Sequence, residues 1–455
     1  MYIKNDDFIL FVENRLIFSL NQCNNTEIDE LIKKYDSGRK INDIMFPYFE
    51  SNMSENISLE KMLPYCCGLN LTNLCQLRCN YCSYCSGEHS FDTAKIENIC
   101  AFLKFIIDNF IYRKKLNISA NNPTIYFAGG GEPTYNWKLL EESVEYIKKY
   151  TLQNKVKYRL GITTNGLLEK RQIDYIIENF DTILVSYDGT KEIQNKNRKS
   201  ISFKNSAKIV ESTIKYLDEK KCSYSIRTTI WPEDYIFMRD MADNIYNRYP
   251  NITSWSIEPV LQLGRAKRND IFNIENKDNI MSVDFVSKYV DLRVYVGEKY
   301  KKYVHTAMIK NEFACYNCAT AFGQFPWLNA NGDIYACLDS IGQTERIGYI
   351  SDSKMTFISY NDDLNLSHIE NMRKMCVGCI AFPFCGGGCP LKHQLNEFGE
   401  RINITSTWDC SQKKKYWQDT YHKLLKYKKT KDFKLKEYDK YNGQTVYQII
   451  KNDEV

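Results

Sequence analysis

Three cysteines at the spacing C-x3-C-x2-C, Cys75, Cys79 and Cys82, lie in one short segment of the chain. Three thiolates from one loop can hold three irons of a cubane iron–sulfur cluster, which leaves the fourth iron open to a small ligand. The alternatives are a zinc site or cysteines of the core, but zinc usually takes four protein ligands and paired C-x2-C knuckles. The segment therefore predicts a cluster with one reactive iron.

The cysteines of this chain are grouped. Eleven of the 17 have ligand-like spacing, whereas scattered core cysteines would not cluster. Outside the groups, Cys85 is left open between an inert residue and a hydrogen donor to a substrate radical, because it lies three residues after Cys82. The grouped cysteines are Cys75, Cys79, Cys82, Cys315, Cys318, Cys337, Cys376, Cys379, Cys385, Cys389 and Cys410.

Composition narrows the class of protein. Lys and Arg number 61 against 56 Asp and Glu in 455 residues, and this weak, dispersed charge gives no indication of a nucleic-acid partner. The sequence has no apolar run of membrane-spanning length and no signal peptide, so we expect a cytoplasmic protein. In that reducing compartment the cysteines are not expected to form disulfides.

The elements that position the first cysteine loop alternate between strand and helix. This alternation predicts a parallel sheet with helices outside it, and six units in about 235 residues fit a partial (β/α)6 barrel better than a closed barrel of eight. The expected strands are 67–71, 124–127, 158–163, 182–187, 224–229 and 255–260. The expected helices are 96–112, 137–150, 170–179, 206–220, 235–248 and 283–300.

Polar loops follow the first four of these strands, at 75–82, 129–134, 164–166 and 188–189. Because ligands of such sheets bind at the carboxyl ends of the strands, the loops predict one common site. The Glu132 carboxylate could pair with a ligand ammonium group, and Asn165 could present its amide. Arg198 is a candidate partner for a carboxylate.

Three further regions flank the barrel, which we place at 63–305. Residues 1–62 contain two strand-like runs, 8–12 and 15–20, and a helix-like run, 28–35; we interpret them as an extension that either packs on the main domain or engages a peptide. Residues 306–420 are rich in Cys and Gly. The Lys- and Tyr-rich tail, 421–455, is expected to be a solvated surface or arm, after a helix at 413–426.

The loop motifs together resemble the radical S-adenosylmethionine (radical SAM) superfamily. The three-cysteine loop is followed by Gly-Gly-Glu-Pro, Thr-Asn-Gly and Ser-x-Asp-Gly, and the resemblance covers roughly 66–260. It implies that S-adenosylmethionine binds the open iron of a [4Fe–4S] cluster and is cleaved to a 5′-deoxyadenosyl radical, which abstracts hydrogen from the substrate. By this resemblance the cofactor is contacted by Tyr81, Gly129, Gly130, Gly131, Glu132, Asn165, Ser186 and Arg198.

The later cysteines resemble a seven-cysteine SPASM domain, which carries two auxiliary [4Fe–4S] clusters. The resemblance implies three clusters in all. A zinc-ribbon interpretation of these cysteines remains the alternative. Cys376, Cys379, Cys385 and Cys410 would hold the second auxiliary cluster, whereas Cys318, Cys337 and Cys389 would hold the first, with Cys315 as a candidate fourth ligand.

The two resemblances imply an oxidoreductase that modifies a peptide or protein, with a flavodoxin- or ferredoxin-type electron donor. The first hypothesis is maturation of a ribosomally made peptide, by thioether or other cross-linking and with possible guidance by a leader. The alternatives are an anaerobic sulfatase-maturing enzyme and a non-catalytic iron–sulfur or zinc module. Sulfatase-maturing enzymes place an Asp base directly after the cysteine that matches Cys337, but here Leu338 intervenes and Asp339 is the candidate base. The sequence does not specify the substrate, the bond formed or the oligomeric state.

Overall fold

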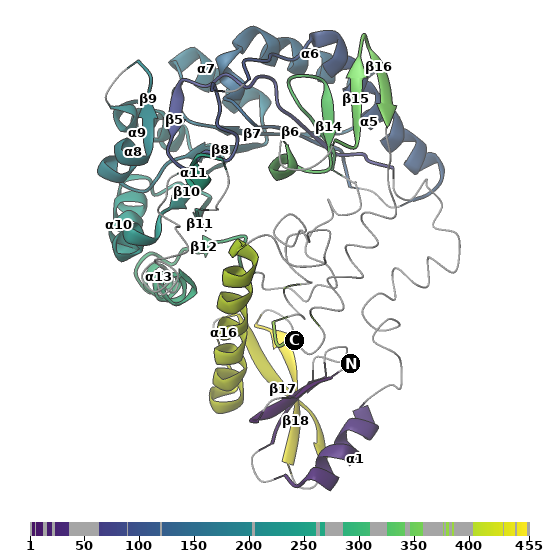
Figure 1. Cartoon of the computed structure of the whole chain (residues 1–455), viewed down its shortest axis with the longest axis vertical. Helices are drawn as coiled ribbons and strands as arrows, with labels where there is room; N and C mark the ends of the chain where they lie inside the picture. Colours follow the sequence, from purple (N-terminus) through teal and green to yellow (C-terminus); the bar gives the residue numbers. More distant parts are fainter. Residues whose placement is uncertain are drawn as a thin grey trace. The chain divides into compact units, whose positions relative to one another are not determined.

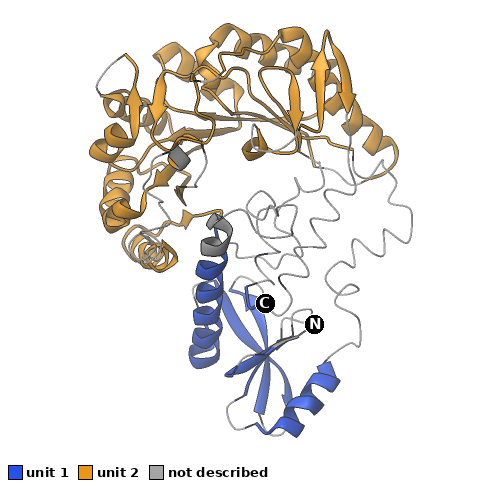
Figure 2. Ribbon diagram, in the orientation of Figure 1, with its two compact units in different colours: residues 1–58, 308–318, 363–455 blue, residues 59–307, 319–362 orange. Residues whose placement is uncertain are grey.

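The chain divides into two compact units (Figure 2), which are described separately. One comprises residues 59–307 and 319–362, and the other residues 1–58, 308–318 and 363–455. The computed structural model describes residues 2–4, 6–11, 16–20, 23–35, 63–88, 90–118, 121–202, 205–260, 264–268, 285–309, 325–341, 346–357, 376, 379–381, 385, 404–430, 432–441 and 444–452.

A parallel sheet forms the centre of the larger unit, and the predicted strands are confirmed. Apolar residues such as Ile125, Phe127, Ile226 and Ile257 are fully buried on it. The strand order is β12-β11-β10-β8-β7-β6-β4, which is an open, partial barrel. The strands are β4 (Cys67–Leu69), β6 (Thr124–Phe127), β7 (Arg159–Thr164), β8 (Thr182–Ser186), β10 (Tyr224–Ile230), β11 (Ser254–Pro259) and β12 (Val304–His305).

Helices cover the outer face of this sheet, as Figure 1 shows. All six predicted helices are present, although the start of the fifth is a 3₁₀ turn, η2 (Pro232–Phe237). Amphipathic periodicity explains them, because each buries one apolar stripe against the strands. They are α5 (Ile96–Lys115), α6 (Trp137–Gln153), α7 (Lys170–Asn179), α9 (Ser206–Glu219), α10 (Met238–Arg248) and α13 (Phe285–Tyr300).

The sheet extends beyond β4 into the Cys-rich region. Strand β13 pairs in parallel with β4, and three antiparallel strands continue from it. These additional strands are β13 (Trp327–Leu328), β14 (Asp333–Tyr335), β15 (Gly348–Ser351) and β16 (Lys354–Phe357). Short elements complete the unit: η1 (Pro133–Tyr135), α8 (Lys191–Asn197), α11 (Arg265–Arg268), η6 (Leu338–Ser340), and a two-stranded sheet of β5 (Leu77–Cys79) and β9 (Arg198–Ser200).

The smaller unit joins the two ends of the chain in one antiparallel sheet. Its order is β1-β2-β3-β18-β17. The predicted hairpin at 8–20 is confirmed as β2 and β3. The expectation of a solvated tail is wrong, because Val446 and Ile449 are fully buried and β18 pairs with β3. The elements are β1 (Tyr2–Lys4), β2 (Phe8–Phe11), β3 (Leu16–Ser19), α1 (Asn25–Tyr35), α16 (Ile404–Tyr427), β17 (Phe433–Tyr441) and β18 (Gln444–Lys451).

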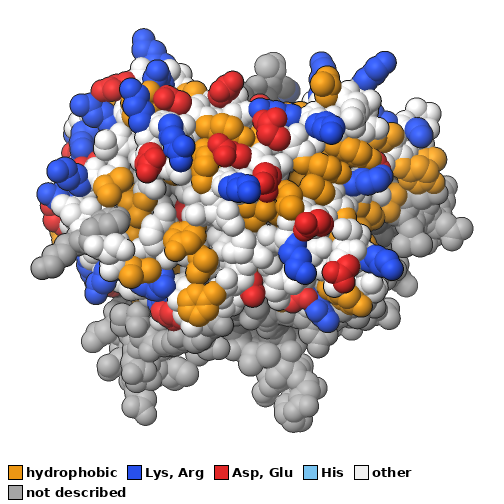
Figure 3. Space-filling view, turned by 90° about the horizontal axis from the view of Figure 1, so that it is seen from above, with side chains coloured by type: hydrophobic (Ala, Val, Ile, Leu, Met, Phe, Trp, Pro, Cys, Tyr) orange, Lys and Arg blue, Asp and Glu red, His pale blue; other side chains and the backbone are white. Residues whose placement is uncertain are grey.

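Capping and surface features agree with the sequence. At the start of α1 the Asn24 side chain accepts a hydrogen bond from the Glu27 amide, and the Glu27 carboxylate accepts one from the Asn24 amide, both at 2.9 Å, which is a capping box. Within the described part of the chain, no helix is long and apolar enough to cross a membrane. The face seen in Figure 3 intersperses cationic, anionic and apolar side chains.

Candidate functional site

Backbone pairing fixes the middle of the three-cysteine loop. Leu77–Cys79 form β5, which runs antiparallel to β9 and places Cys79 opposite Arg198. The Ile201 amide donates to the Gln76 carbonyl at 3.1 Å, which extends this pairing by one bond. The loop is therefore anchored to the segment that follows β8, a contact that strand prediction did not reveal because both strands have only three residues.

The three thiols of this loop suit a cluster. Cys75, Cys79 and Cys82 are half-buried and form no disulfide. Burial raises the pKa of Cys75 to about 12 and also raises that of Cys79, and in both cases the neighbouring thiols act in the same direction. Iron would therefore have to displace the protons on binding. No three His, Cys, Asp or Glu side chains among the described residues converge as a single metal ion requires, whereas cluster thiolates each bind a separate iron.

Two arginines hold the backbone of the loop, and only one lies within it. Arg78 donates to the carbonyls of Cys75 and Gly87, each at 2.9 Å. Arg265, from α11, donates to the carbonyls of Cys79 at 2.8 Å and Ser86 at 2.9 Å. Sequence reasoning missed Arg265, because nothing in its local sequence marks a contact with a loop 186 residues away.

Asp188 joins the loop to the sheet. Its fully buried carboxylate accepts hydrogen bonds from the Tyr81 hydroxyl at 2.5 Å and from Arg198 Nε at 3.1 Å. Burial raises the pKa of Asp188 while the Arg198 charge opposes that rise, and the Arg198 guanidinium lies 5.3 Å from the centre of the Tyr81 ring. The predicted cofactor contacts Tyr81 and Arg198 are thus brought together around one carboxylate.

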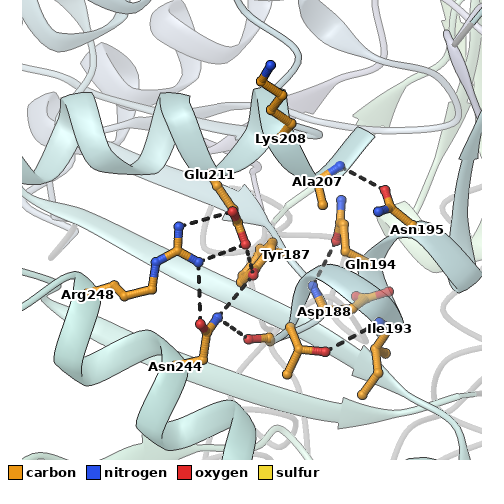
Figure 4. Close-up of polar contacts among 12 residues, drawn as sticks. Tyr187, Asp188, Ile193, Gln194, Asn195, Ala207, Lys208, Glu211, Asn244 and Arg248 are labelled. Carbon is orange, nitrogen blue, oxygen red and sulfur yellow. Dashed lines mark hydrogen bonds and ion pairs between the residues drawn. The ribbon is translucent and has the colours of Figure 1, made fainter. Parts of the chain in front are cut away.

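A polar network behind Asp188 fixes the turn that carries it (Figure 4). The Tyr187 hydroxyl donates to Glu211 at 2.7 Å, and Arg248 donates to both oxygens of that carboxylate at 2.8 and 3.0 Å. Asn244 donates to the Gly189 carbonyl at 2.7 Å. Helices α9 and α10 therefore hold the end of β8 through charge-assisted bonds.

Glu211→Gln is expected to lower stability at neutral pH and to flatten its pH dependence. Burial alone would raise the pKa of Glu211, but the bonds from Arg248 and Tyr187 outweigh it and lower the pKa. A carboxylate with a lowered pKa contributes stability above the ordinary glutamate value, ~4.3, and loses it as pH falls through the folded value. Urea unfolding should thus show a wild-type advantage that is largest near neutrality and shrinks in acid. An advantage that grows in acid would contradict this assignment.

The glycine loop packs against the segment that leads into the cysteines. A Cβ atom at Gly131 would lie 2.2 Å from the Leu74 carbonyl oxygen, and one at Gly129 would lie 2.6 Å from the Asn70 side chain. Gly129 also has a φ of +150°, a conformation that favours glycine. Close packing between the two loops therefore requires glycine at positions 129 and 131, independently of any contact with a ligand.

Glu132, which the sequence suggested as an ammonium partner, is 3% exposed and already hydrogen-bonded. Its Oε1 accepts from the hydroxyls of Thr134 at 2.7 Å and Thr164 at 2.8 Å, and its Oε2 accepts from the Asn165 amide at 2.7 Å. Burial raises the pKa of Glu132, while these donors oppose the rise. The carboxylate thus ties the end of β6 to the end of β7.

Glu132→Gln is expected to destabilise the protein by about 1–3 kcal/mol, the usual cost of an unsatisfied buried donor. Either orientation of the glutamine amide turns its NH₂ group toward a backbone N–H, that of Thr134 or that of Asn165. Urea unfolding measures the change. The matched control is Glu192→Gln, an exposed residue whose replacement should be nearly neutral. Equal stability of both variants would contradict the structural role of Glu132.

Asn165 and Ser186 lie at the ends of neighbouring strands. Asn165 Nδ2 donates to Gln76 Oε1 at 3.0 Å and lies 3.8 Å from Cys75 Sγ. Ser186 is the last residue of β8 and is partly exposed. Asn165 therefore contacts the three-cysteine loop, and Ser186 is partly exposed to solvent at the same edge of the sheet.

The Cys-rich region reaches this site through Tyr84, which sequence reasoning missed. The Tyr84 hydroxyl donates to the Leu338 carbonyl at 2.9 Å. Burial raises the pKa of Tyr84, and the nearby charges of Asp339 and Cys337 act in the same direction. Asp339 is exposed, in η6, whereas the partly buried Leu338 packs on an apolar cluster with Tyr84. Asp339 thus directly follows the residue that Tyr84 contacts.

The remaining cysteines of the predicted clusters fall in different parts of the chain. Cys376, Cys379, Cys385 and Cys410 belong to the smaller unit, and Tyr421 of α16 is influenced by the charge of Cys379. Cys337 belongs to the larger unit. Cys315, Cys318 and Cys389 lie outside the described residues.

Comparison with known proteins finds a family model that matches part of this chain, and relatives that match most of it. Residues 69–243 match the model of the Radical SAM superfamily. The chain is 24% identical over 386 residues to a cysteine-type anaerobic sulfatase-maturating enzyme of Clostridium novyi (strain NT), covering 78% of this chain and 95% of that protein. A second such enzyme, from Clostridium perfringens (strain 13 / Type A), is 21% identical over 374 residues, with 77% and 94% covered.

A solved structure shares the fold. Native anSMEcpe with bound AdoMet and Cp18Cys peptide superposes with a TM-score of 0.56 at 18% identity, over 80% of this chain and 98% of that one. The partial barrel and the strands that extend it are therefore a known arrangement, and the radical SAM resemblance of the loop motifs is confirmed.

Proposed function

Because residues 69–243 form a radical SAM domain, we propose that this enzyme cleaves S-adenosylmethionine reductively and removes hydrogen from a peptide or protein substrate. The observation that carries the proposal is the meeting of the three-cysteine loop and its lead-in with the polar ends of β6, β7 and β8 on one edge of the sheet. Tyr84, just after the loop, contacts Leu338 of the Cys-rich region. A [4Fe–4S] cluster and S-adenosylmethionine, when bound, would supply the radical chemistry.

The residues of the chain have separate tasks in this proposal. Cys75, Cys79 and Cys82 would hold the cluster, with Arg78 and Arg265 keeping their loop in shape. Of the predicted cofactor contacts, Ser186 is partly exposed at the site edge and remains suited to touch the ligand directly. Asn165 is 7% exposed and holds Gln76 of the three-cysteine loop. Glu132 and Asp188 act through the loops that they join.

We further propose that the substrate is a ribosomally made peptide that becomes cross-linked. A net two-electron oxidation needs an electron acceptor, which auxiliary clusters on the later cysteines would provide, and a proton acceptor. Asp339 is the candidate for the second role. The site directly after Cys337 is occupied by Leu338, whose side chain packs on the apolar cluster with Tyr84 and cannot accept a proton.

The second candidate function is maturation of a sulfatase by formylglycine formation. Its support is the similarity to cysteine-type anaerobic sulfatase-maturating enzymes over most of both chains. The two candidates share the first chemical steps and differ in the fate of the substrate radical and in the residue that accepts the proton.

Product analysis separates them. Reconstituted enzyme is incubated anaerobically with dithionite, S-adenosylmethionine and either a sulfatase peptide that contains the target Cys or a Cys-rich peptide encoded beside the gene. Cross-linking removes two hydrogens from the peptide and makes no aldehyde. Formylglycine formation removes two hydrogens from the CH2–SH group of the Cys, and water then exchanges the sulfur for oxygen with release of hydrogen sulfide, which leaves an aldehyde. An aldehyde product from the sulfatase peptide would overturn the first candidate.

The setting of this reaction is proposed to be the cytoplasm. Reduced thiols and an oxygen-sensitive open cluster both need a reducing compartment, and a flavodoxin- or ferredoxin-type protein would supply the electron that the cleavage consumes. The β3 edge of the N-terminal hairpin is paired with β18. Guidance by a leader peptide would therefore require another strand edge.

A further inference from the structure

A row of alternating large and small residues crosses the inner face of the barrel sheet. Backbone register aligns Trp327 of β13 with Gly68 of β4, Gly68 with Tyr126 of β6, and Tyr126 with Gly161 of β7. A Cβ atom at Gly68 would lie 2.1 Å from the Trp327 ring, and one at Gly161 would lie 2.3 Å from the Tyr126 ring. Both glycines therefore make space for an aromatic ring.

These rings face the interior of the barrel and away from the helices. The neighbour of Tyr126, Phe127, packs on Phe180 at the end of α7 with ring centres 5.6 Å apart, so Tyr126 points to the opposite face. The Tyr126 and Trp327 rings are 6.4 Å apart, and Tyr84 packs on the same cluster. We call Tyr84, Tyr126 and Trp327 the aromatic floor.

The side chain of Arg227 lies on the same face of the sheet as this aromatic floor. Arg227 is on β10, where its neighbours Ile226 and Thr228 are fully buried on the outer face, so its side chain is on the inner face. Its register partner on β8 is Ser186, at the site edge. The charge of Arg227 acts on Tyr126, which shares the inner face of the sheet with it. Arg227 is exposed and makes no ion pair or side-chain hydrogen bond with the described part of the chain.

Arg198, at the same site, differs from Arg227 in both burial and pairing. Arg198 is 7% exposed and bound to Asp188, and it lies against Tyr81 and opposite Cys79. Its charge is therefore already compensated next to the three-cysteine loop. Among the described residues, the Arg227 charge has no ion-pair partner, and it lies on the inner face of the sheet, the face of the aromatic floor.

We infer that Arg227 and the aromatic floor form a subsite for a carboxylate of the peptide substrate, next to the residue that loses hydrogen. A guanidinium group binds a carboxylate through two parallel hydrogen bonds. The partly exposed rings of Tyr84 and Tyr126 would contact the adjoining apolar part of the peptide, with the buried Trp327 packed in the same cluster. The carboxylate belongs to an Asp or Glu side chain or to the peptide C-terminus. This inference rests on the proposed function, since it specifies the class of peptide that the same site accepts.

Affinity selection tests the inference without requiring turnover. Reconstituted enzyme with S-adenosylmethionine is offered an equimolar library of synthetic decapeptides. Each peptide has one fixed Cys, every other position is Asp or Asn, and the C-terminus is free or amidated. Bound peptides are counted by mass spectrometry. Wild type should enrich one acid over its amide by about ten- to a hundred-fold, as expected for a hydrogen bond to a charged group. Enrichment at an internal position identifies a side chain, and dependence on the free C-terminus identifies the terminal carboxylate.

Variants assign the preference to one residue. Arg227→Gln should abolish it, Arg227→Lys should retain part of it, and Arg159→Gln, which removes an exposed arginine from the start of β7 in the same sheet, should leave it unchanged. Loss of the preference in Arg159→Gln, or its persistence in Arg227→Gln, would overturn the inference. A cofactor role for Arg227 would also overturn the inference. In that case Arg227→Gln would bind S-adenosylmethionine more weakly than wild type and would no longer distinguish it from decarboxylated S-adenosylmethionine.

Failure of the carboxylate subsite and failure of the proposed function give different results. If fully loaded enzyme releases no 5′-deoxyadenosine but still selects acidic peptides through Arg227, the function is wrong and the subsite stands. If it modifies peptides with no preference between acid and amide, the function stands and the subsite is wrong.

Discussion

Replacing Cys75, Cys79 and Cys82 together by alanine is expected to reduce 5′-deoxyadenosine release to background. The three thiols lie in one loop that backbone pairing with β9 holds against the site. Without them the loop holds no cluster whose open iron could bind and reduce S-adenosylmethionine, so the effect is complete and is not a partial loss of affinity. Anaerobic incubation with dithionite followed by chromatography of the nucleoside measures it.

The matched control for this variant is Cys100→Ala. Cys100 is a half-buried cysteine of α5 outside every predicted ligand group, so the variant should release wild-type amounts of 5′-deoxyadenosine. If the folded triple variant released 5′-deoxyadenosine at the wild-type rate, the assignment of the cluster to this loop would be wrong.

Replacing Cys376 and Cys379 by alanine is expected to separate cofactor cleavage from product formation. We propose that both bind the second auxiliary cluster, in the smaller unit, whereas the S-adenosylmethionine site belongs to the larger one. The variant should lose about four irons per chain, the content of one cubane cluster, and should form little cross-linked peptide. It should nevertheless release 5′-deoxyadenosine in the presence of the peptide.

Two readouts make this second prediction specific. Cys222→Ala, which removes a half-buried thiol that donates to the Leu217 carbonyl, serves as the control and should keep both the irons and the product. If the Cys376 and Cys379 variant keeps its full iron content, or loses zinc in place of iron, the cysteines do not hold an auxiliary cluster.

The barrel could be predicted because its sequence pattern is local and regular. Each of the first four strands is a short, mostly apolar run followed within two residues by Gly, Asn or Asp, and each helix repeats apolar residues at the helical period. The polar loops could be assigned to one site because parallel strands end on one edge. Helix α7, for example, has the predicted bounds, Lys170–Asn179.

What the sequence did not reveal depends on contacts between distant residues. Arg265 reaches the loop from 186 residues away, and the pairing of β18 with β3 joins the two ends of the chain. The roles of Glu132 and Asp188 were also hidden, because a carboxylate in a loop can face a ligand or the protein. Four donors from β6, β7 and their loops turn Glu132 inward, and sequence pattern carries no information on that choice.

Metal analysis tests most directly whether the chain carries auxiliary clusters beside the cluster proposed for the three-cysteine loop. Iron, sulfide and zinc are counted per chain after anaerobic reconstitution of the wild-type protein. We expect about twelve irons with as many sulfides, from three cubane clusters, and no zinc. About four irons with two zincs would contradict it, because the later cysteines would then form a structural module without redox chemistry.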